Sequence, residues 1–126
     1  MLRQHLNRPG RLLEIGSGTG QHAAWLPAHL PGIRWQPSDL PDALPGIEAW
    51  LAETGTDNVD APLVLDVRGR WPEQRFDYVF TANTFHIMDA DSVRRCIEQA
   101  AQRLRRDGLF IVYGPFRYEG SCSDSN

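Results

Sequence analysis

The sequence contains no lysine, so all 13 basic residues are arginines, and 16 acidic residues outnumber them. The formal net charge is −3. Proteins that bind nucleic acids usually present a basic surface, which displaces counterions from the phosphates. The charge balance therefore argues against a nucleic-acid partner. The missing lysine indicates no function by itself.

Cysteine is also scarce, since only Cys96 and Cys122 are present, far apart and without paired spacing. Disulfide frameworks and zinc sites require repeated, closely spaced cysteines. The sequence therefore predicts neither a disulfide nor a metal site. Cys96 falls within an expected helix, where a buried and inert thiol is the favoured interpretation.

Long apolar segments are absent. Met1 to Arg11 is polar and basic, and no apolar run approaches the length of about 20 residues that spans a membrane. We therefore expect a cytoplasmic protein without a signal peptide or membrane contact. The 126 residues fit a single domain covering 1–126. We expect a small-molecule substrate, and the sequence does not indicate an oligomeric state.

Short apolar runs without polar alternation predict strands that are buried on both faces. They are Arg11–Ile15, Ile33–Pro37, Pro62–Val67, Phe76–Thr81 and Leu109–Tyr113. Apolar residues at helical spacing predict helices over Gln21–Leu30, Leu44–Ala52 and Asp91–Arg106. This alternation predicts an α/β fold with a Rossmann-like parallel sheet, helices on both faces and strand order 3-2-1-4-5. Ligands of such sheets bind at the carboxyl ends of the strands.

The expected helix over Asp91–Arg106 has the usual charge pattern of a helix. It carries an acid at its start and Arg103, Arg105 and Arg106 in its last turn, with Asp107-Gly108 beyond. Acids near the start and bases near the end complement the helix dipole, and glycine commonly follows a helix. We therefore interpret the arginine cluster as a solvated helix end rather than an anion site.

A glycine-rich turn joins the first expected strand to the first expected helix, with glycines at 16, 18 and 20. Glycine there permits unusual dihedrals and a close approach of the backbone to a ligand. A dinucleotide-binding turn needs Gly-x-Gly-x-x-Gly, but counting from Gly16 the third position is Gln21. Glu14 would repel phosphates, whereas it suits the ammonium group of a methionine moiety, directly or through water. Both features disfavour an NAD-type oxidoreductase.

Acidic residues end the next two expected strands. Asp39 lies 23 residues beyond Gly16, where a carboxylate can accept from both ribose hydroxyls, a feature that NAD-type folds share. Asp66 can accept from an adenine amino group while the amide of Val67 donates to the ring. Alternatively, Asp66 is a solvated loop acid or a helix cap. A third acid at a third strand end favours a ligand contact, because binding sites gather a few convergent polar groups.

These features resemble the class I S-adenosylmethionine-dependent methyltransferases. More narrowly, the chain is similar to the methyltransferase-like proteins filed as domain of unknown function 938. The matching stretches are Leu13–Ala23, Trp35–Asp39, Leu65–Val67, Thr81–Met88 and Tyr113–Phe116. The first is common to many methyltransferases, whereas the last two are far more specific. Members of this family usually extend further at both ends, so we expect the domain to be incomplete at its C-terminus and its last strand to have an uncovered edge.

The resemblance implies that S-adenosyl-L-methionine is the cofactor and that methyl transfer to an unidentified small molecule is the activity. The residues implied at the methionine end are Glu14, Gly16, Ser17, Gly18, Gly20 and Asn83. Those implied at the ribose and adenine are Asp39, Leu40, Asp66 and Val67. A non-catalytic module that binds S-adenosylmethionine without turnover remains an alternative.

No catalytic residue follows from the sequence alone. His86 comes after the fourth expected strand, where it takes a proton, orients a substrate or is a structural histidine. Tyr113 either lends its hydroxyl to the pocket or packs as an aromatic core residue. A general base is needed only if the methyl acceptor must lose a proton, so both residues stay candidates.

Overall fold

The computed structural model describes residues 8–17, 23, 25–82 and 89–113. Strands and helices alternate along them, as the sequence predicts. The elements in chain order are β1 (Gly10–Ile15), η1 (Leu26–His29), β2 (Ile33–Asp39), η2 (Pro41–Ala43), α3 (Leu44–Thr54), β3 (Leu63–Val64), β4 (Phe76–Ala82), α4 (Ala90–Arg103) and β5 (Leu104–Tyr113). None of the helices in these ranges is long and apolar enough to cross a membrane.

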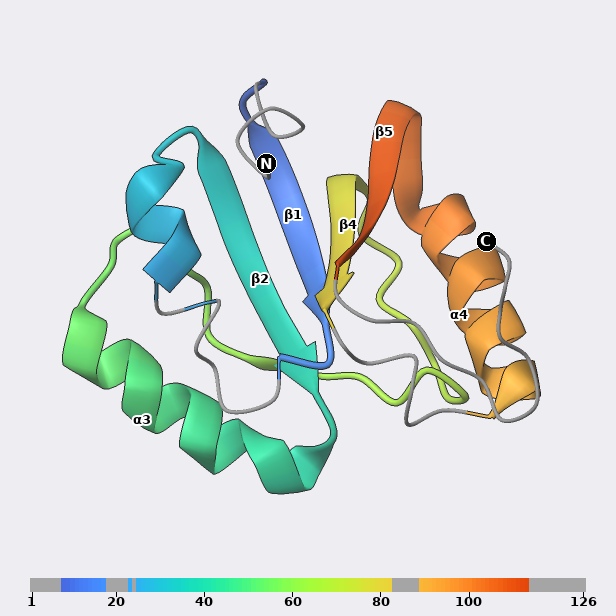
Figure 1. Cartoon of the computed structure of the whole chain (residues 1–126), viewed down its shortest axis with the longest axis horizontal. Helices are drawn as coiled ribbons and strands as arrows, with labels where there is room; N and C mark the ends of the chain where they lie inside the picture. Colours follow the sequence, from blue (N-terminus) through green and yellow to red (C-terminus); the bar gives the residue numbers. More distant parts are fainter. Residues whose placement is uncertain (1–7, 18–22, 24, 83–88, 114–126) are drawn as a thin grey trace.

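The five strands form one sheet in the order β3-β2-β1-β4-β5, and every neighbouring pair is parallel (Figure 1). This confirms the predicted Rossmann-like fold and its strand order. The described residues contribute no antiparallel strand pair to this sheet. Because the strands are parallel, all their carboxyl ends lie at one edge, which is where the described part of the predicted site, such as Gly16, Asp39 and Asp66, is found.

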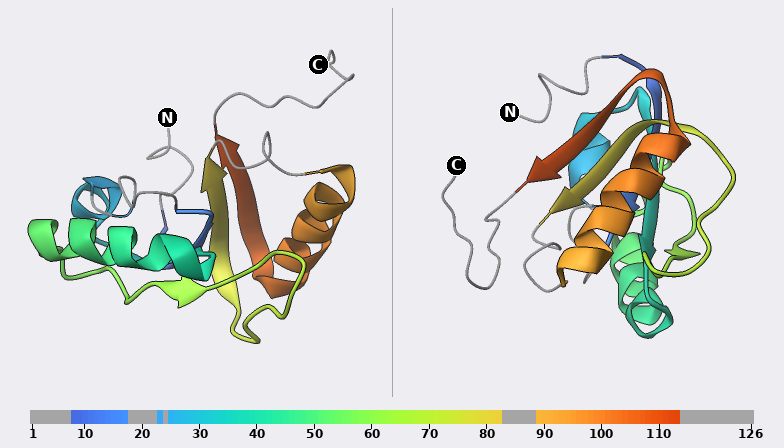
Figure 2. Two further views of the ribbon diagram at one scale, coloured as in Figure 1. Left: turned by 90° about the horizontal axis from the view of Figure 1, so that it is seen from below. Right: turned by 90° about the vertical axis from the view of Figure 1, so that its right-hand side faces the viewer.

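Successive residues of β1 point to opposite faces of the sheet and belong to two different cores. Leu13 joins Val93, Cys96 and Ala100 of α4 on one face. Leu12 packs on the other face with Leu30, Trp35 and Phe80, to which η1 and α3 add partly buried side chains. Figures 1 and 2 show α3 beside β2 and α4 beside β5, at opposite ends of the sheet.

The last helix and last strand differ from the sequence prediction. The helix ends at Arg103, not Arg106, and Leu104 is already extended and paired with Phe76. Regular pairing with β4 resumes only at Leu109, which pairs with Tyr78. The residues between Leu104 and Leu109 form an irregular insertion, in which Asp107 is in the left-handed region at φ 69°. The helical spacing of Leu104 misled the prediction, because the same side chain also packs against the core beside α4.

Two further elements differ from expectation. β3 is only Leu63–Val64, because it pairs with β2 through two residues, whereas we expected a strand over Pro62–Val67. The first expected helix is a short 3-10 turn at Leu26–His29 preceded by helical Ala23 and Trp25, and residues 21, 22 and 24 lie outside the described part. Pro27 explains the change, because proline lacks an N–H donor and clashes with the carbonyl four residues earlier.

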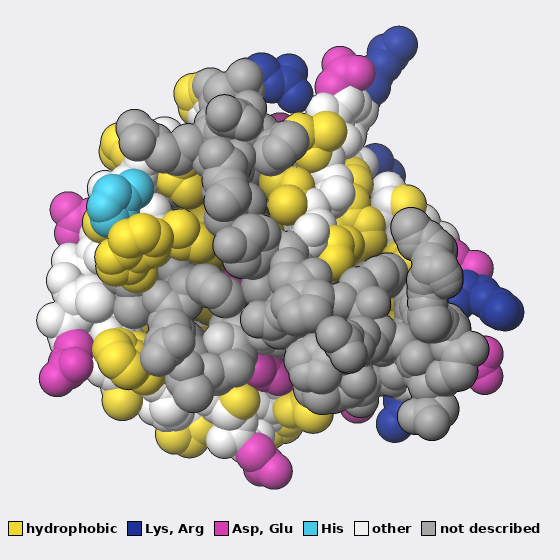
Figure 3. Space-filling model, in the orientation of Figure 1, with side chains coloured by type: hydrophobic (Ala, Val, Ile, Leu, Met, Phe, Trp, Pro, Cys, Tyr) yellow, Lys and Arg dark blue, Asp and Glu magenta, His cyan; other side chains and the backbone are white. Residues whose placement is uncertain are grey.

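The edge strand β5 leaves Leu109 and Val112 partly exposed, at 41% and 43% of their surface. The expectation that the last strand has an uncovered edge remains a prediction. Elsewhere, Figure 3 shows hydrophobic side chains beside a histidine on one flank, with acidic and basic side chains dispersed around the rim. Trp25, whose ring lies 4.6 Å from that of His29 (between centroids) and is tilted by 41° to it, is 62% exposed.

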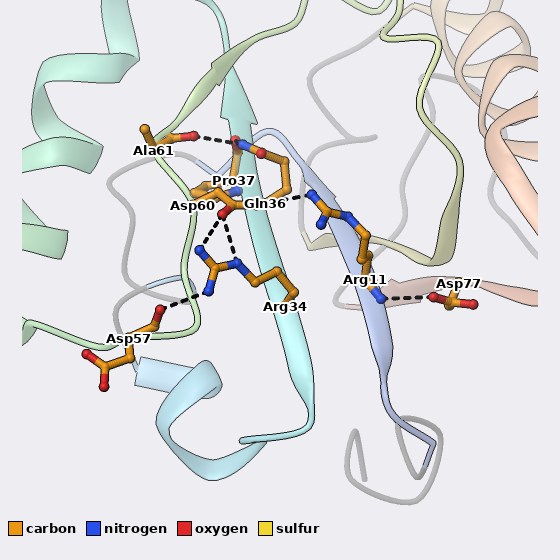
Figure 4. A network of polar contacts seen from close by, with 8 residues as sticks. All are labelled: Arg11, Arg34, Gln36, Pro37, Asp57, Asp60, Ala61 and Asp77. Carbon is orange, nitrogen blue, oxygen red and sulfur yellow. Dashed lines mark hydrogen bonds and ion pairs between the residues drawn. The ribbon is translucent and has the colours of Figure 1, made fainter.

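Figure 4 shows a polar network over the sheet that includes Arg11. Arg11 and Leu13 are two residues apart in β1, so they lie on the same face of the sheet. Arg34 of β2 donates to Asp60 at 2.8 Å, and Arg11 of β1 approaches the same carboxylate at 3.4 Å. The backbone amide of Arg11 donates to Asp77 at 2.9 Å. Charged side chains therefore occupy strand positions where the sequence prediction expected burial on both faces.

Candidate functional site

The carboxyl end of β1 is held by a buried polar cluster. Glu14 is fully buried, and its Oε1 accepts from Ser17 Oγ and from Trp35 Nε1, each at 3.0 Å. Ser17 Oγ in turn accepts from the amide of Ser38 at 3.0 Å, and the Ser17 amide donates to the Ser38 carbonyl at 2.8 Å. The cluster therefore ties the start of the glycine turn to the end of β2.

Gly16 begins the turn in the left-handed region, at φ 69°. Glycine adopts this conformation without the steric cost that a side chain would impose. The backbone can therefore leave the end of β1 sharply and approach the space beyond the strand, as the sequence predicts.

A cleft of about 270 Å³ opens at the carboxyl ends of β1, β2 and β3 and the start of α4. Its walls bring together five of the predicted cofactor residues from three separate loops: Gly16, Asp39, Leu40, Asp66 and Val67. The other lining residues are Ile15, Leu65, Arg68, Asp89 and Ser92. Glu14 and Ser17 are not among the residues that line this cleft, and their role at the methionine end stays a prediction.

On the β2 side, Asp39 and Leu40 combine a charged acceptor with an apolar surface. Asp39 Oδ1 accepts from the amide of Leu40 at 2.7 Å, which fixes the carboxylate at the strand end. The side chain of Leu40 is 48% exposed although it is apolar. An acceptor beside an exposed apolar side chain suits a ligand that carries both hydroxyls and a flat ring.

On the β3 side, Asp66 begins a tight turn. Its Oδ1 accepts from the amide of Arg68 at 3.0 Å, and its carbonyl accepts from the amide of Gly69 at 2.7 Å. The carboxylate therefore has a structural role, which was the alternative interpretation from the sequence. It also lines the cleft. A carboxylate accepts about four hydrogen bonds, so the two roles are compatible.

The start of α4 forms a wall that the sequence analysis missed. Asp89 caps the helix, because its side chain accepts from the amide of Ser92 at 2.8 Å. Hydrogen bonds from Ser92 lower the pKa of Asp89, and the charge of Arg68 lowers it further. An aspartate three residues before a serine at a helix start is a recognisable cap, but we placed the helix start at Asp91.

The other predicted site residues are not placed. Gly18, Gly20, Asn83 and His86 lie outside the described residues, and so does the side chain of Tyr113. The two catalytic candidates therefore remain untested predictions.

The whole chain, residues 1–126, matches the family described as "Protein of unknown function (DUF938)". The chain belongs to this family. Its fold is that of the class I S-adenosylmethionine-dependent methyltransferases, as the solved structures that resemble it show. The family resemblance inferred from the sequence is thus confirmed.

Three solved structures illustrate the similarity. The S-adenosylmethionine-dependent methyltransferase SibL, in its apo form, is 22% identical with a TM-score of 0.77, over 85% of this chain and 32% of SibL. The CcbJ methyltransferase from Streptomyces caelestis is 26% identical with a TM-score of 0.68, over 82% of this chain and 42% of CcbJ. PigF, solved with SAH, is 23% identical with a TM-score of 0.71, over 81% of this chain and 31% of PigF. The DUF938 chain spans less than half the length of each of them.

Proposed function

We propose that this chain binds S-adenosylmethionine in the cleft at the ends of β1, β2 and β3 and transfers its methyl group to a small-molecule acceptor. The observation that carries the proposal is the gathering of Gly16, Asp39 and Asp66, with their neighbours Leu40 and Val67, around one cleft. Those residues were predicted to bind the cofactor from the sequence alone. Methyltransferases among the structural relatives support the same activity.

The chemistry of the cleft fits this cofactor. Asp39 offers a carboxylate to the two ribose hydroxyls, and the exposed side chain of Leu40 offers an apolar surface to the base. Asp66 offers an acceptor for the adenine amino group. Gly16 leaves space for the backbone to approach the ligand closely. We propose that Glu14, Ser17, Gly18, Gly20 and Asn83 serve the methionine end.

S-adenosylmethionine supplies an activated methyl group on a sulfonium centre with a neutral leaving group. The protein then has to bring donor and acceptor together in the right orientation, which provides most of the rate in reactions of this type. The strand ends are suited to that task because the Glu14 cluster and the Asp66 turn fix them by hydrogen bonds. His86 and Tyr113 are the candidates for moving a proton from the acceptor.

Calorimetric titration with S-adenosylmethionine, S-adenosylhomocysteine and NAD tests the binding step. We expect both sulfur compounds to bind and NAD not to bind. Preferential binding of NAD would instead support an oxidoreductase and contradict the proposal.

A screen of small-molecule acceptors with radiolabelled S-adenosylmethionine tests the transfer step. We expect label to appear in at least one acceptor, at a rate that depends on protein concentration. Tight binding of both sulfur compounds without transfer to any acceptor would support a non-catalytic binding module instead.

A further inference from the structure

The turn Asp66–Gly69 presents the predicted adenine contacts, and its backbone is fixed from inside. The amide of Gly69 donates to the carbonyl of Asp66 at 2.7 Å, and the amide of Arg68 donates to Asp66 Oδ1 at 3.0 Å. A trans peptide is planar, with its carbonyl and N–H pointing in opposite directions. The carbonyl of Asp66 faces into the turn, so the N–H of Val67, in the same peptide, is directed away from the turn interior.

The same turn is also held from α4. Arg95 Nε donates to the carbonyl of Val67 at 3.1 Å, and Arg95 Nη2 donates to the carbonyl of Gly69 at 2.9 Å. The indole Nε1 of Trp71 donates to the Val67 carbonyl as well, at 3.0 Å. A guanidinium is a rigid planar fork, so two such bonds fix both the position and the orientation of the turn.

Arg95 also connects two walls of the cleft. It lies three residues after Ser92, which lines the cleft from α4, and it binds the turn whose Asp66 and Val67 line the cleft from the other side. Residues three apart on a helix lie on the same side of it. The guanidinium therefore links the turn to the helix that carries Ser92.

We propose that Arg95 is a positioning residue that holds the Asp66–Gly69 turn against α4, and thereby sets how selectively the cleft recognises the 6-amino group of adenine. The inference rests on the proposed function. Arg95 touches only backbone carbonyls of the turn in these contacts, so it acts through Asp66 and Val67 rather than on the cofactor.

The test compares Arg95→Ala with Arg103→Ala. Arg103 is a matched control because it lies on the same helix and its Nε donates to Pro72 O, in the same β3–β4 connection but outside the cleft. Binding is measured by calorimetry for S-adenosylhomocysteine and for S-inosylhomocysteine, in which a carbonyl oxygen replaces the 6-amino group. The inosine compound has no 6-amino group to donate to Asp66, and its N1 carries a hydrogen and cannot accept from the Val67 amide. The ratio of the two dissociation constants therefore reports how well the turn recognises this edge of the adenine.

We expect Arg95→Ala to weaken S-adenosylhomocysteine binding about tenfold, which corresponds to about 1.4 kcal/mol. Binding of S-inosylhomocysteine should change much less. The dissociation constant for S-inosylhomocysteine divided by that for S-adenosylhomocysteine therefore falls. The ratio for Arg95→Lys should lie between those of the unmodified chain and Arg95→Ala, because an ammonium group keeps the charge but lacks the planar fork of a guanidinium. Arg103→Ala should leave the ratio unchanged. An equal loss for both compounds, or the same loss in Arg103→Ala, would mean a general structural role and overturn the inference.

Hydrogen exchange in the absence of any cofactor separates this inference from the proposed function. We expect the amides of Arg68 and Gly69 to exchange faster in Arg95→Ala than in the unmodified chain or in Arg103→Ala. Unchanged exchange would overturn the positioning role. An unmodified chain that binds neither homocysteine compound would instead refute the proposed function.

Discussion

Replacing Asp39 separates the two tasks that its carboxylate is expected to perform. Its Oδ1 accepts from the Leu40 amide at 2.7 Å and fixes the end of β2, while the carboxylate also lines the cleft. Asp39→Ala removes both the turn contact and the proposed acceptor for the ribose. Asp39→Asn keeps one oxygen, which can still accept from Leu40, but it loses the charge and the second acceptor oxygen.

The expected magnitude follows from these contacts. Hydrogen bonds to a charged group contribute about 1.5–3 kcal/mol, so Asp39→Ala should raise the dissociation constant for S-adenosylmethionine between about 10-fold and 150-fold. The Leu40 bond is at a half-exposed strand end, so the free energy of unfolding should fall by only about 0.5–1.5 kcal/mol. Asp39→Asn should be close to the unmodified chain in stability and still bind the cofactor more weakly.

Calorimetry gives the dissociation constants, and urea unfolding without ligand gives the stabilities. Asp42→Ala is the matched control, because Asp42 is an exposed aspartate three residues further along that does not line the cleft. Unchanged binding in both Asp39 variants would show that this aspartate only forms a turn. Equal weakening in Asp42→Ala would point to a general effect of surface charge.

Three further predictions concern the framework of the site. Glu14→Ala should lower the free energy of unfolding by about 2–5 kcal/mol in urea titrations, because it leaves two buried donors without their acceptor; a loss under about 1 kcal/mol would contradict this. Gly108→Ala should destabilise by about 1–3 kcal/mol, since its new Cβ would lie 2.9 and 3.0 Å from two backbone oxygens. Gly46→Ala in α3 meets nothing within 4 Å and should not destabilise. Burial raises the pKa of Cys96 from 9.0 to about 12, so in a Cys122→Ser background the native protein should not react with thiol reagents at pH 8. Because the folded-state pKa is the higher one, the contribution of Cys96 to stability should be constant below pH 9 and fall as the pH rises from 9 toward 12; rapid labelling of the folded protein would refute the assignment.

The sheet could be predicted because its strands carry a strong local signal. Leu12, Leu13 and Ile15 are apolar in succession, as a strand buried on both faces requires, and all are at most 2% exposed. The alternation with helical segments then leaves few right-handed topologies. Glycine and acidic residues at strand ends predicted the position of the cleft for a related reason. Parallel strands bring their carboxyl ends to one edge of the sheet.

What escaped prediction depends on contacts between residues that are far apart in the sequence. The helix end at Arg103 depends on Leu104 pairing with Phe76, which no helical periodicity reveals. The role of Arg95 has no local signal in the sequence, because its partners Val67 and Gly69 are 28 and 26 residues away. Backbone carbonyls carry no sequence signature, so an arginine that binds them cannot be distinguished in advance from a solvated one.

The two interpretations that the sequence left open for Asp66, a loop acid or a ligand contact, are compatible with each other. A carboxylate that accepts from the Arg68 amide is already held in a single orientation before any ligand arrives. A group ordered in advance loses less conformational entropy on binding, so the same hydrogen bond to a ligand gives more affinity. Asp39, which also lines the cleft, is held in the same way by the Leu40 amide. The turn contacts at the strand ends are therefore what we expect of a binding site whose acceptors are fixed by the fold.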